Sequence, residues 1–170
     1  MNAPYQGKFR VSQCYSAAHT GLDLVGIDSK EIHSTVNGTV IRAGWENPND
    51  HNKGFGQRVV IQKDGSNAYY YFGHLSEIRV KAGDKVKITD VIGVEGSTGY
   101  STGSHCHYEC RLGDNKSKHQ DISKISGIPN AIGTYDDGYR PPAAPTPQPE
   151  TKQVSLTLDG ATWKGTLTKQ

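Results

Sequence analysis

The chain has 170 residues, 34% of them hydrophobic, and its 19 Lys or Arg against 17 Asp or Glu give a formal net charge of +2. This length predicts one main domain with room for a small appendage. The nearly balanced charge excludes the concentrated basic face of a nucleic-acid-binding protein, and no apolar run approaches the roughly 20 residues that a membrane span needs. The 20 glycines and 9 tyrosines beside a single Met favour β-structure with many turns.

A short entry strand and a turn are expected within residues 5–18, followed by the segment His19-Thr-Gly-Leu-Asp23. Gly21 disfavours a helix here, so we expect an extended or loop segment on which residues 19, 21 and 23 share a face. A His and a carboxylate around an empty position can chelate a metal ion. The alternative is a His–Asp pair on the surface.

The middle of the chain alternates between strand and turn signals. Strand-like stretches occupy residues 36–44, 57–63, 68–72, 80–86 (with a turn inside it) and 91–94. Asn37-Gly38 and Asp64-Gly65 supply the turn conformations of hairpins. The polar loop over residues 45–56 is long enough to wall a cleft rather than merely join two strands. The aromatic stretch leads directly to His74, and its tyrosines are expected to fill the sheet, some of them lining a cleft.

A Gly-, Ser- and Thr-rich loop over residues 95–104 delivers the chain to His105-Cys106-His107. Side chains on a strand alternate between faces, so His105 and His107 point one way while Cys106 and Cys110 face the core. Two imidazoles side by side suit a metal ligand paired with a proton-handling group. The alternative is two partly exposed histidines, and the pattern does not indicate which of the two would bind a metal. An odd number of cysteines and no CxxC pair predict neither a disulfide framework nor a structural Cys–zinc site.

The strand signals weaken in the last third of the chain. Three isoleucines spaced three apart, at 122, 125 and 128, are typical of a short helical turn or a packed loop. A Pro-rich tract then predicts an extended, semi-rigid linker. We expect a main domain over residues 1–132, the linker over 133–152 and a small module over 153–170.

The module has the pattern of a β-hairpin. Val154, Leu156 and Leu158 alternate, Asp159-Gly160 supplies the turn, and Trp163 begins the return. An isolated hairpin is marginal in water, so this one is expected to need a partner surface or a second copy of itself. Wall targeting, self-association and an ordinary terminal extension are the three alternatives for its role.

Taken together, His19-x-Gly-x-Asp23, Gly-His74-Leu-Ser and the Gly-rich loop into His105-x-His107 resemble, in order and spacing, the M23 family of zinc metallopeptidases, the lysostaphin/LytM type. The resemblance covers roughly residues 17–113 and includes Asn37-Gly-Thr-Val and Gly96-Ser-Thr-Gly99. One departure is Cys106, where the family usually has Leu. The resemblance implies an all-β fold, a compact antiparallel β-sheet domain with long cleft-walling loops.

The resemblance also implies a role for five side chains. His19, Asp23 and His107 would bind Zn²⁺. Two histidines and one carboxylate leave an open position for water, which is the arrangement of a catalytic rather than a structural zinc site. His74 and His105 would flank that water, one as general base and proton shuttle and the other as a hydrogen-bond donor to the oxyanion.

The three remaining histidines that match no family position are His33, His51 and His119. All three are interpreted as loop or surface residues. His51 and Tyr71 are the candidates for the cleft rim and for contact with substrate.

By resemblance, the substrate is the peptide part of bacterial peptidoglycan, and the chain is a cell-wall lytic endopeptidase of the phage endolysin type. Residues 1–10 contain no apolar segment of the kind found in signal peptides. We therefore expect synthesis in the host cytoplasm and action on the wall after release, or as part of a virion. The alternatives are an M23-like wall-binding protein without cleavage activity, against which the filled ligand positions argue, and a virion structural protein.

Overall fold

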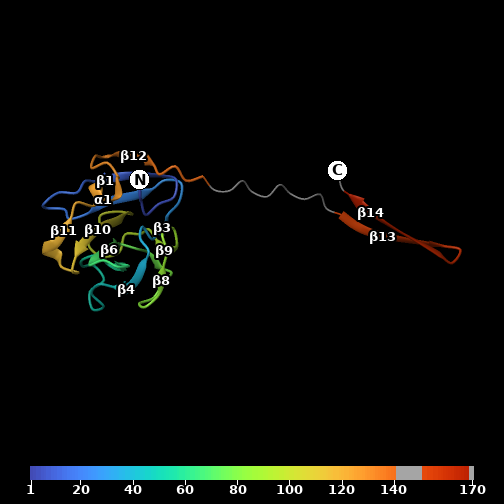
Figure 1. The fold of residues 1–170 in the computed structure, drawn as a ribbon, viewed down its shortest axis with the longest axis horizontal. Helices are drawn as coiled ribbons and strands as arrows, with labels where there is room; N and C mark the ends of the chain where they lie inside the picture. Colours follow the sequence, from blue (N-terminus) through green and yellow to red (C-terminus); the bar gives the residue numbers. More distant parts are fainter. Residues whose placement is uncertain (141–150, 169–170) are drawn as a thin grey trace. The chain divides into compact units, whose positions relative to one another are not determined.

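The computed structural model describes residues 1–140 and 151–168, which divide into two units, Met1–Arg140 and Pro141–Gln170 (Figure 1). The first unit consists almost entirely of antiparallel strands, as predicted, with one short helix, α1 (Ile122–Ser126), and one 3-10 turn, Lys116–Lys118. Its strands are β1 (Lys8–Gln13), β2 (Leu22–Gly26), β3 (Glu31–His33), β4 (Gly38–Trp45), β5 (Gln57–Lys63), β6 (Ala68–Gly73), β7 (Glu77–Ile78), β8 (Lys85–Val86), β9 (Val91–Val94), β10 (Cys106–Leu112), β11 (His119–Gln120) and β12 (Gly133–Asp136).

Two sheets make up this unit. The large sheet has the order β12-β1-β2-β10-β6-β5-β4-β8, with β11 paired to β10, and the small one has the order β3-β9-β7. Because every pairing is antiparallel, short turns and loops are enough to connect most strands. Strand β10 lies at the centre of the large sheet, between β2 and β6.

The two faces of β10 carry different chemistry. Cys106, Tyr108 and Cys110 are buried in the hydrophobic core, as the alternation predicts for the two cysteines. His107, Glu109 and Arg111 occupy the opposite face. The core side also holds aromatic rings of β1 and β6, so β10 is fixed from both neighbouring strands.

The end of the main domain differs from the prediction. The linker was expected to begin at residue 133, but β12 (Gly133–Asp136) pairs with β1 in register, with Tyr135 opposite Phe9. The rings of Tyr135 and Phe9 lie 6.2 Å apart, and Tyr135 packs against the core, which explains why this segment joins the sheet. The rest of the predicted linker lies mostly within residues 141–150, outside the described residues.

The second unit contains a hairpin of β13 (Thr151–Leu158) and β14 (Ala161–Thr168), close to the predicted bounds. Asp159 and Gly160 both have positive φ, 48° and 79°, which is the conformation of a type I′ turn. The expected roles in wall targeting or self-association stay predictions. Within residues 1–140 and 151–168, no helix has the length and apolarity needed to cross a bilayer.

Candidate metal centre

The register of the large sheet places the candidate residues in one row. His107 on β10 lies opposite Asp23 of β2 on one side and Gly73 of β6 on the other. Directly opposite residues have Cβ atoms about 5 Å apart, so side chains on this face meet across the three strands. His74 follows Gly73 immediately, and it is fixed by a hydrogen bond from its backbone N–H to Phe55 O, 2.7 Å.

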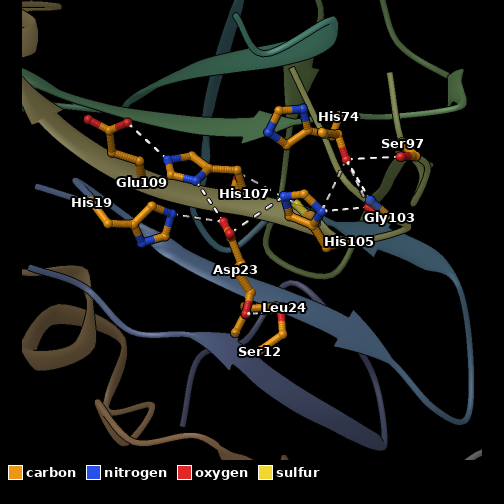
Figure 2. A network of polar contacts seen from close by, with 12 residues as sticks. Ser12, His19, Asp23, Leu24, His74, Ser97, Gly103, His105, His107 and Glu109 are labelled. Atoms are coloured by element: carbon orange, nitrogen blue, oxygen red, sulfur yellow. Dashed lines mark hydrogen bonds and ion pairs between the residues drawn. The ribbon is translucent and has the colours of Figure 1, made fainter. Parts of the chain in front are cut away.

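Three histidines surround the Asp23 carboxylate, and a fourth, His74, lies beside His105 (Figure 2). Asp23 Oδ1 lies 3.1 Å from His19 Nε2 and 2.8 Å from His107 Nδ1, and its Oδ2 lies 3.6 Å from His105 Nε2. The rings of His105 and His74 are 4.6 Å apart. The structure therefore brings together all five side chains that were proposed for the chemistry.

Three of the five fit a metal ion. One ligand atom from each of His19, Asp23 and His107 lies within 4.8 Å of the other two. Two imidazole nitrogens and one carboxylate oxygen are the donor set of catalytic zinc sites, which keep a further position open. The three residues are half-buried or buried, which limits competition from bulk water while leaving the site open to the cleft.

The second nitrogen of each of these metal-binding imidazoles is held by the protein. His19 Nδ1 lies 2.9 Å from Cys14 O, and His107 Nε2 lies 3.3 Å from Glu109 Oε2. A carbonyl or a carboxylate can only accept, so each of these nitrogens carries a proton, and the opposite nitrogen, which faces Asp23, is the one that would bind a metal. Such outer partners fix the ring orientation of metal-binding histidines.

The two flanking histidines are held in the same way. His74 Nδ1 lies 2.7 Å from Thr98 O, and His105 Nδ1 lies 2.8 Å from Gly103 O. Each ring is thus set with Nε2 as its free nitrogen. His74 also has a φ of 62°, a left-handed conformation that is uncommon for a residue other than glycine. Backbone strain of this kind persists only where the surrounding structure imposes it, and it clusters at functional sites.

At neutral pH, Asp23 is charged and His74 is neutral. Burial alone would raise the pKa of Asp23, but hydrogen bonds with His107 and His19 outweigh it and hold that pKa below its usual range. Burial lowers the pKa of His74 to about 4, against the opposing hydrogen bond to Thr98. His74 is therefore neutral at neutral pH, and its Nε2 can accept a proton.

A cleft of about 770 Å³ opens over these groups. All five site residues line it, and its walls come from the loop over residues 45–56, as predicted, and from residues 100–102. Hydrogen bonds join the two walls, from Tyr100 N to Gly54 O at 2.9 Å and from Gly99 N to His51 O at 3.1 Å. A Cβ on Gly99 would lie 2.2 Å from Gly56 N, so this close approach requires a glycine.

The predicted rim residues lie elsewhere. Tyr71 is only 1% exposed and lies beneath Arg111, whose guanidinium carbon is 4.1 Å from its ring centroid. His51 stacks flat on Trp45, with ring centroids 3.6 Å apart, and neither His51 nor Tyr71 is among the residues that line the cleft. Tyr71 is covered because β6 places it opposite Glu109, under the side chains of β10.

Two of the remaining histidines, His33 and His119, are less exposed than the surface position that the sequence predicts. His33 on β3 is buried, and its Nδ1 lies 2.8 Å from Thr89 O. His119 on β11 is half-buried, and its Nδ1 lies 3.0 Å from the Tyr15 hydroxyl. Both have a structural partner that comes from a distant part of the chain.

Sequence reasoning missed Glu109 and Arg111. Glu109 is fully buried and accepts from Arg111 Nε at 2.7 Å and Nη2 at 3.0 Å while it faces His107. The signal was present in the sequence, because the period-two pattern that links His105 and His107 continues to residues 109 and 111 with two further polar side chains. A buried face with four polar residues in a row requires partners.

Comparison with known proteins agrees with this geometry. The family model "Peptidase family M23" matches residues 17–121. The glycyl-glycine endopeptidase ALE-1 of Staphylococcus capitis is 36% identical over 92 residues, which cover 54% of this chain and 24% of that protein. The chain thus matches about a quarter of the length of this curated relative.

Two solved structures share the fold. The catalytic domain of the antimicrobial peptidase lysostaphin from Staphylococcus simulans has a TM-score of 0.59 at 28% identity, over 71% of this chain and 91% of that one. A mutant catalytic domain of the prophage-encoded M23 protein EnpA from Enterococcus faecalis has a TM-score of 0.58 at 32% identity, over 71% of this chain and 94% of that one.

Proposed function

Because the chain belongs to peptidase family M23, we propose that it is a zinc-dependent endopeptidase that hydrolyses amide bonds in the peptide part of bacterial peptidoglycan. The observation that carries the proposal is the grouping of His19, Asp23 and His107 beside two further anchored histidines at an open cleft. The relative ALE-1 is named a glycyl-glycine endopeptidase, and lysostaphin an antimicrobial peptidase.

The chain's own residues supply the positioning. His19, Asp23 and His107 would hold the ion, and their outer partners fix which atoms face it. When bound, a zinc ion would act as a Lewis acid toward the scissile carbonyl and make water more acidic. The depressed pKa of Asp23 keeps its carboxylate charged, which suits a ligand to a cation.

His74 and His105 would handle the protons. Each presents Nε2 toward the cleft because Nδ1 is bound to a backbone carbonyl. One ring takes a proton from the attacking water on Nε2 and passes it to the leaving amine. The other, when it carries a proton on both nitrogens, donates a hydrogen bond from Nε2 to the oxygen on which negative charge develops. Burial keeps the His74 ring neutral at neutral pH, so its Nε2 lone pair is available.

The test combines metal analysis with the release of new amino groups from purified peptidoglycan of several chemotypes. Protein with one bound zinc that releases amino groups, and that loses this activity in a chelator and regains it with zinc, supports the proposal. Zinc-loaded protein that releases none from any chemotype would favour the alternative, an M23-like wall-binding protein. Mass spectrometry of the digests would identify the bond.

We further propose that the enzyme acts as a phage lysin, made in the host cytoplasm and reaching the wall after release, or as part of a virion. The similarity to the prophage-encoded M23 protein supports this setting. Cytoplasmic expression in a sensitive bacterium should cause lysis only after the membrane is permeabilised. Lysis without permeabilisation would contradict the proposed setting.

A further inference from the structure

The two anionic side chains that line the cleft are already engaged. Asp23 is shared among the histidines of the metal centre. Glu46 accepts from Arg58 Nη1 at 2.5 Å through Oε1 and from the Phe55 backbone N–H at 2.6 Å through Oε2. Neither carboxylate is therefore free to pair with a cationic group of a substrate.

Of the three cationic side chains that line the cleft, Lys53 and Lys116 are less compensated than Arg111. Lys116 has no ion-pair or hydrogen-bond partner for its ammonium among the described residues. Lys53 pairs with Asp50 at 3.0 Å, but the Lys53 side chain is largely exposed and such surface pairs are weak. The cleft therefore has unused positive charge beyond the metal ligands, and a bound divalent cation would add to it.

The third cation, Arg111, is held ready for a ligand. Its Nε and Nη2 are bonded to the buried Glu109, and its guanidinium lies 4.1 Å above the Tyr71 ring and 5.3 Å from the Phe55 ring. Its Nη1 lies outside the pair with Glu109. An arginine that is stacked and anchored in this way loses little further side-chain freedom when it binds a planar anion.

The side chain of Arg111 lies close to the metal centre. Glu109 Oε2 accepts from Arg111 Nη2 at 3.0 Å and lies 3.3 Å from His107 Nε2, so the two nitrogens are no more than about 6 Å apart. A strand advances about 3.3 Å per residue, so an extended peptide that has one amide at the metal reaches Arg111 within about one to three residues.

We propose that this cleft selects substrates by a free carboxylate that lies about one to three residues from the scissile amide and binds Arg111 and Lys116. This specificity rests on the proposed peptidoglycan endopeptidase function. It favours stem peptides that carry free carboxylates over bridges built of uncharged residues. Arg111 offers the Nη1 group that lies outside its pair with Glu109, and Lys116 adds a point charge.

The test uses a soluble peptidoglycan fragment that the zinc-loaded protein cleaves, and the same fragment after its free carboxylates are converted to carboxamides. The conversion removes the negative charge of each carboxylate and leaves the size of the group nearly unchanged. We expect kcat/KM for the carboxylate form to exceed that for the amidated form about tenfold, mainly through KM, and we expect the ratio to shrink as salt is added. Equal cleavage of the two forms would overturn the inference while leaving the peptidase function intact.

Variants of the two residues test which side chains are responsible for the selectivity. Lys116→Gln should lower the ratio of kcat/KM for the carboxylate form to kcat/KM for the amidated form about threefold. Arg111→Lys keeps the positive charge but loses the planar guanidinium, and it should also lower this ratio. Lys118→Gln is the matched control, since it removes the same charge from the same 3-10 turn at a residue that does not line the cleft.

The ratio compares two substrates on one protein, so a loss of folded protein does not change it. An unchanged ratio in both cleft variants would overturn the assignment of these residues. Failure to cleave peptidoglycan at all would instead refute the proposed function.

Discussion

The imidazole of His107 lies between two carboxylates, with Nδ1 2.8 Å from Asp23 Oδ1 and Nε2 3.3 Å from Oε2 of the fully buried Glu109. Burial alone would raise the pKa of Glu109, but hydrogen bonds with His107 and Arg111 keep it below its ordinary value. Glu109 is therefore charged at neutral pH and can only accept a hydrogen bond. Glu109 therefore holds a proton on Nε2, and a metal ion bound at Nδ1 would take the place of the proton that Nδ1 shares with Asp23.

Replacing Glu109 with Gln should weaken zinc binding, because the amide no longer supplies the charge that orients and polarises His107. Loss of such an outer partner typically costs about 10- to 100-fold in metal affinity. Competition with a chromogenic chelator measures the affinity directly. Glu77→Gln is the control, since Glu77 is exposed on β7 and pairs with Arg79 instead. Zinc affinity equal to that of the unaltered protein would contradict the role of Glu109.

Alanine variants of the two strand histidines should separate their roles. His105→Ala is expected to reduce cleavage by at least about 100-fold while zinc stays bound, since general acid–base residues contribute effects of this size. His107→Ala should lose both zinc and activity. Metal content and the release of amino groups are measured on the same preparations.

His51→Ala serves as the control for this pair, because His51 stacks on Trp45 and does not line the cleft. It should retain zinc and nearly full activity. Loss of zinc in the His105 variant would show that His105 is a ligand and would overturn the division of roles.

Local patterns in the sequence were enough for many of the strands. Turn signals such as Asp64-Gly65 mark where β5 ends, and alternation places Cys106 in the core and His107 on the other face. These two inferences use only neighbours along the chain. The five site residues, by contrast, were indicated by the order and spacing of motifs that resemble a known family.

The features that sequence reasoning missed depend on contacts between distant segments. Strand β12 exists because residues 133–136 meet β1, more than 120 residues earlier, and nothing local distinguishes it from a linker. His33 is buried because the Thr89 carbonyl lies beside it. The space expected at Gly21 is filled by the ring of His107, which the chain supplies from across the sheet.

Gly21→Ala should damage the metal centre. A Cβ at this position would lie 2.6 Å from His107 Nε2 and 2.6 Å from Tyr108 O, and the backbone oxygen cannot move easily. We expect zinc affinity and cleavage to fall at least about tenfold, with a loss of stability on the order of 1–3 kcal/mol from overpacking. Titration with zinc and urea unfolding measure the two effects.

The matched control is Gly103→Ala, since an added Cβ there meets no atom within 4 Å and the backbone does not have positive φ. Its carbonyl, which accepts from His105, is kept. This variant should bind zinc and cleave normally. Equal behaviour of the two alanine variants would contradict the steric account of Gly21.

The last prediction concerns the acid stability that Glu95 provides. This buried carboxylate accepts four hydrogen bonds, from the hydroxyls of Tyr5 at 2.6 Å and Ser104 at 2.5 Å, from Gly26 N at 2.7 Å and from Lys30 Nζ at 2.8 Å. It thereby joins the N-terminal segment and β2 to the residue that precedes His105. Burial alone would raise the pKa of Glu95, but the bonds with Lys30, Ser104, Tyr5 and Gly26 lower it below the ordinary 4.5.

A lowered folded-state pKa means that Glu95 contributes stability at pH values above its unfolded pKa of about 4.5, and that this contribution is lost as pH falls through the folded value. Glu95→Gln should therefore lower the free energy of unfolding at pH 7 by about 2–3 kcal/mol, because its amide NH₂ group faces donors and Lys30 loses its counter-charge. The variant should also lose less further stability than the unaltered protein between pH 5 and pH 3. Urea unfolding at each pH measures both effects in metal-free protein, with Glu77→Gln as the exposed control. Parallel pH profiles for the Glu95 variant and the unaltered protein would show that Glu95 is not the group whose protonation destabilises the fold.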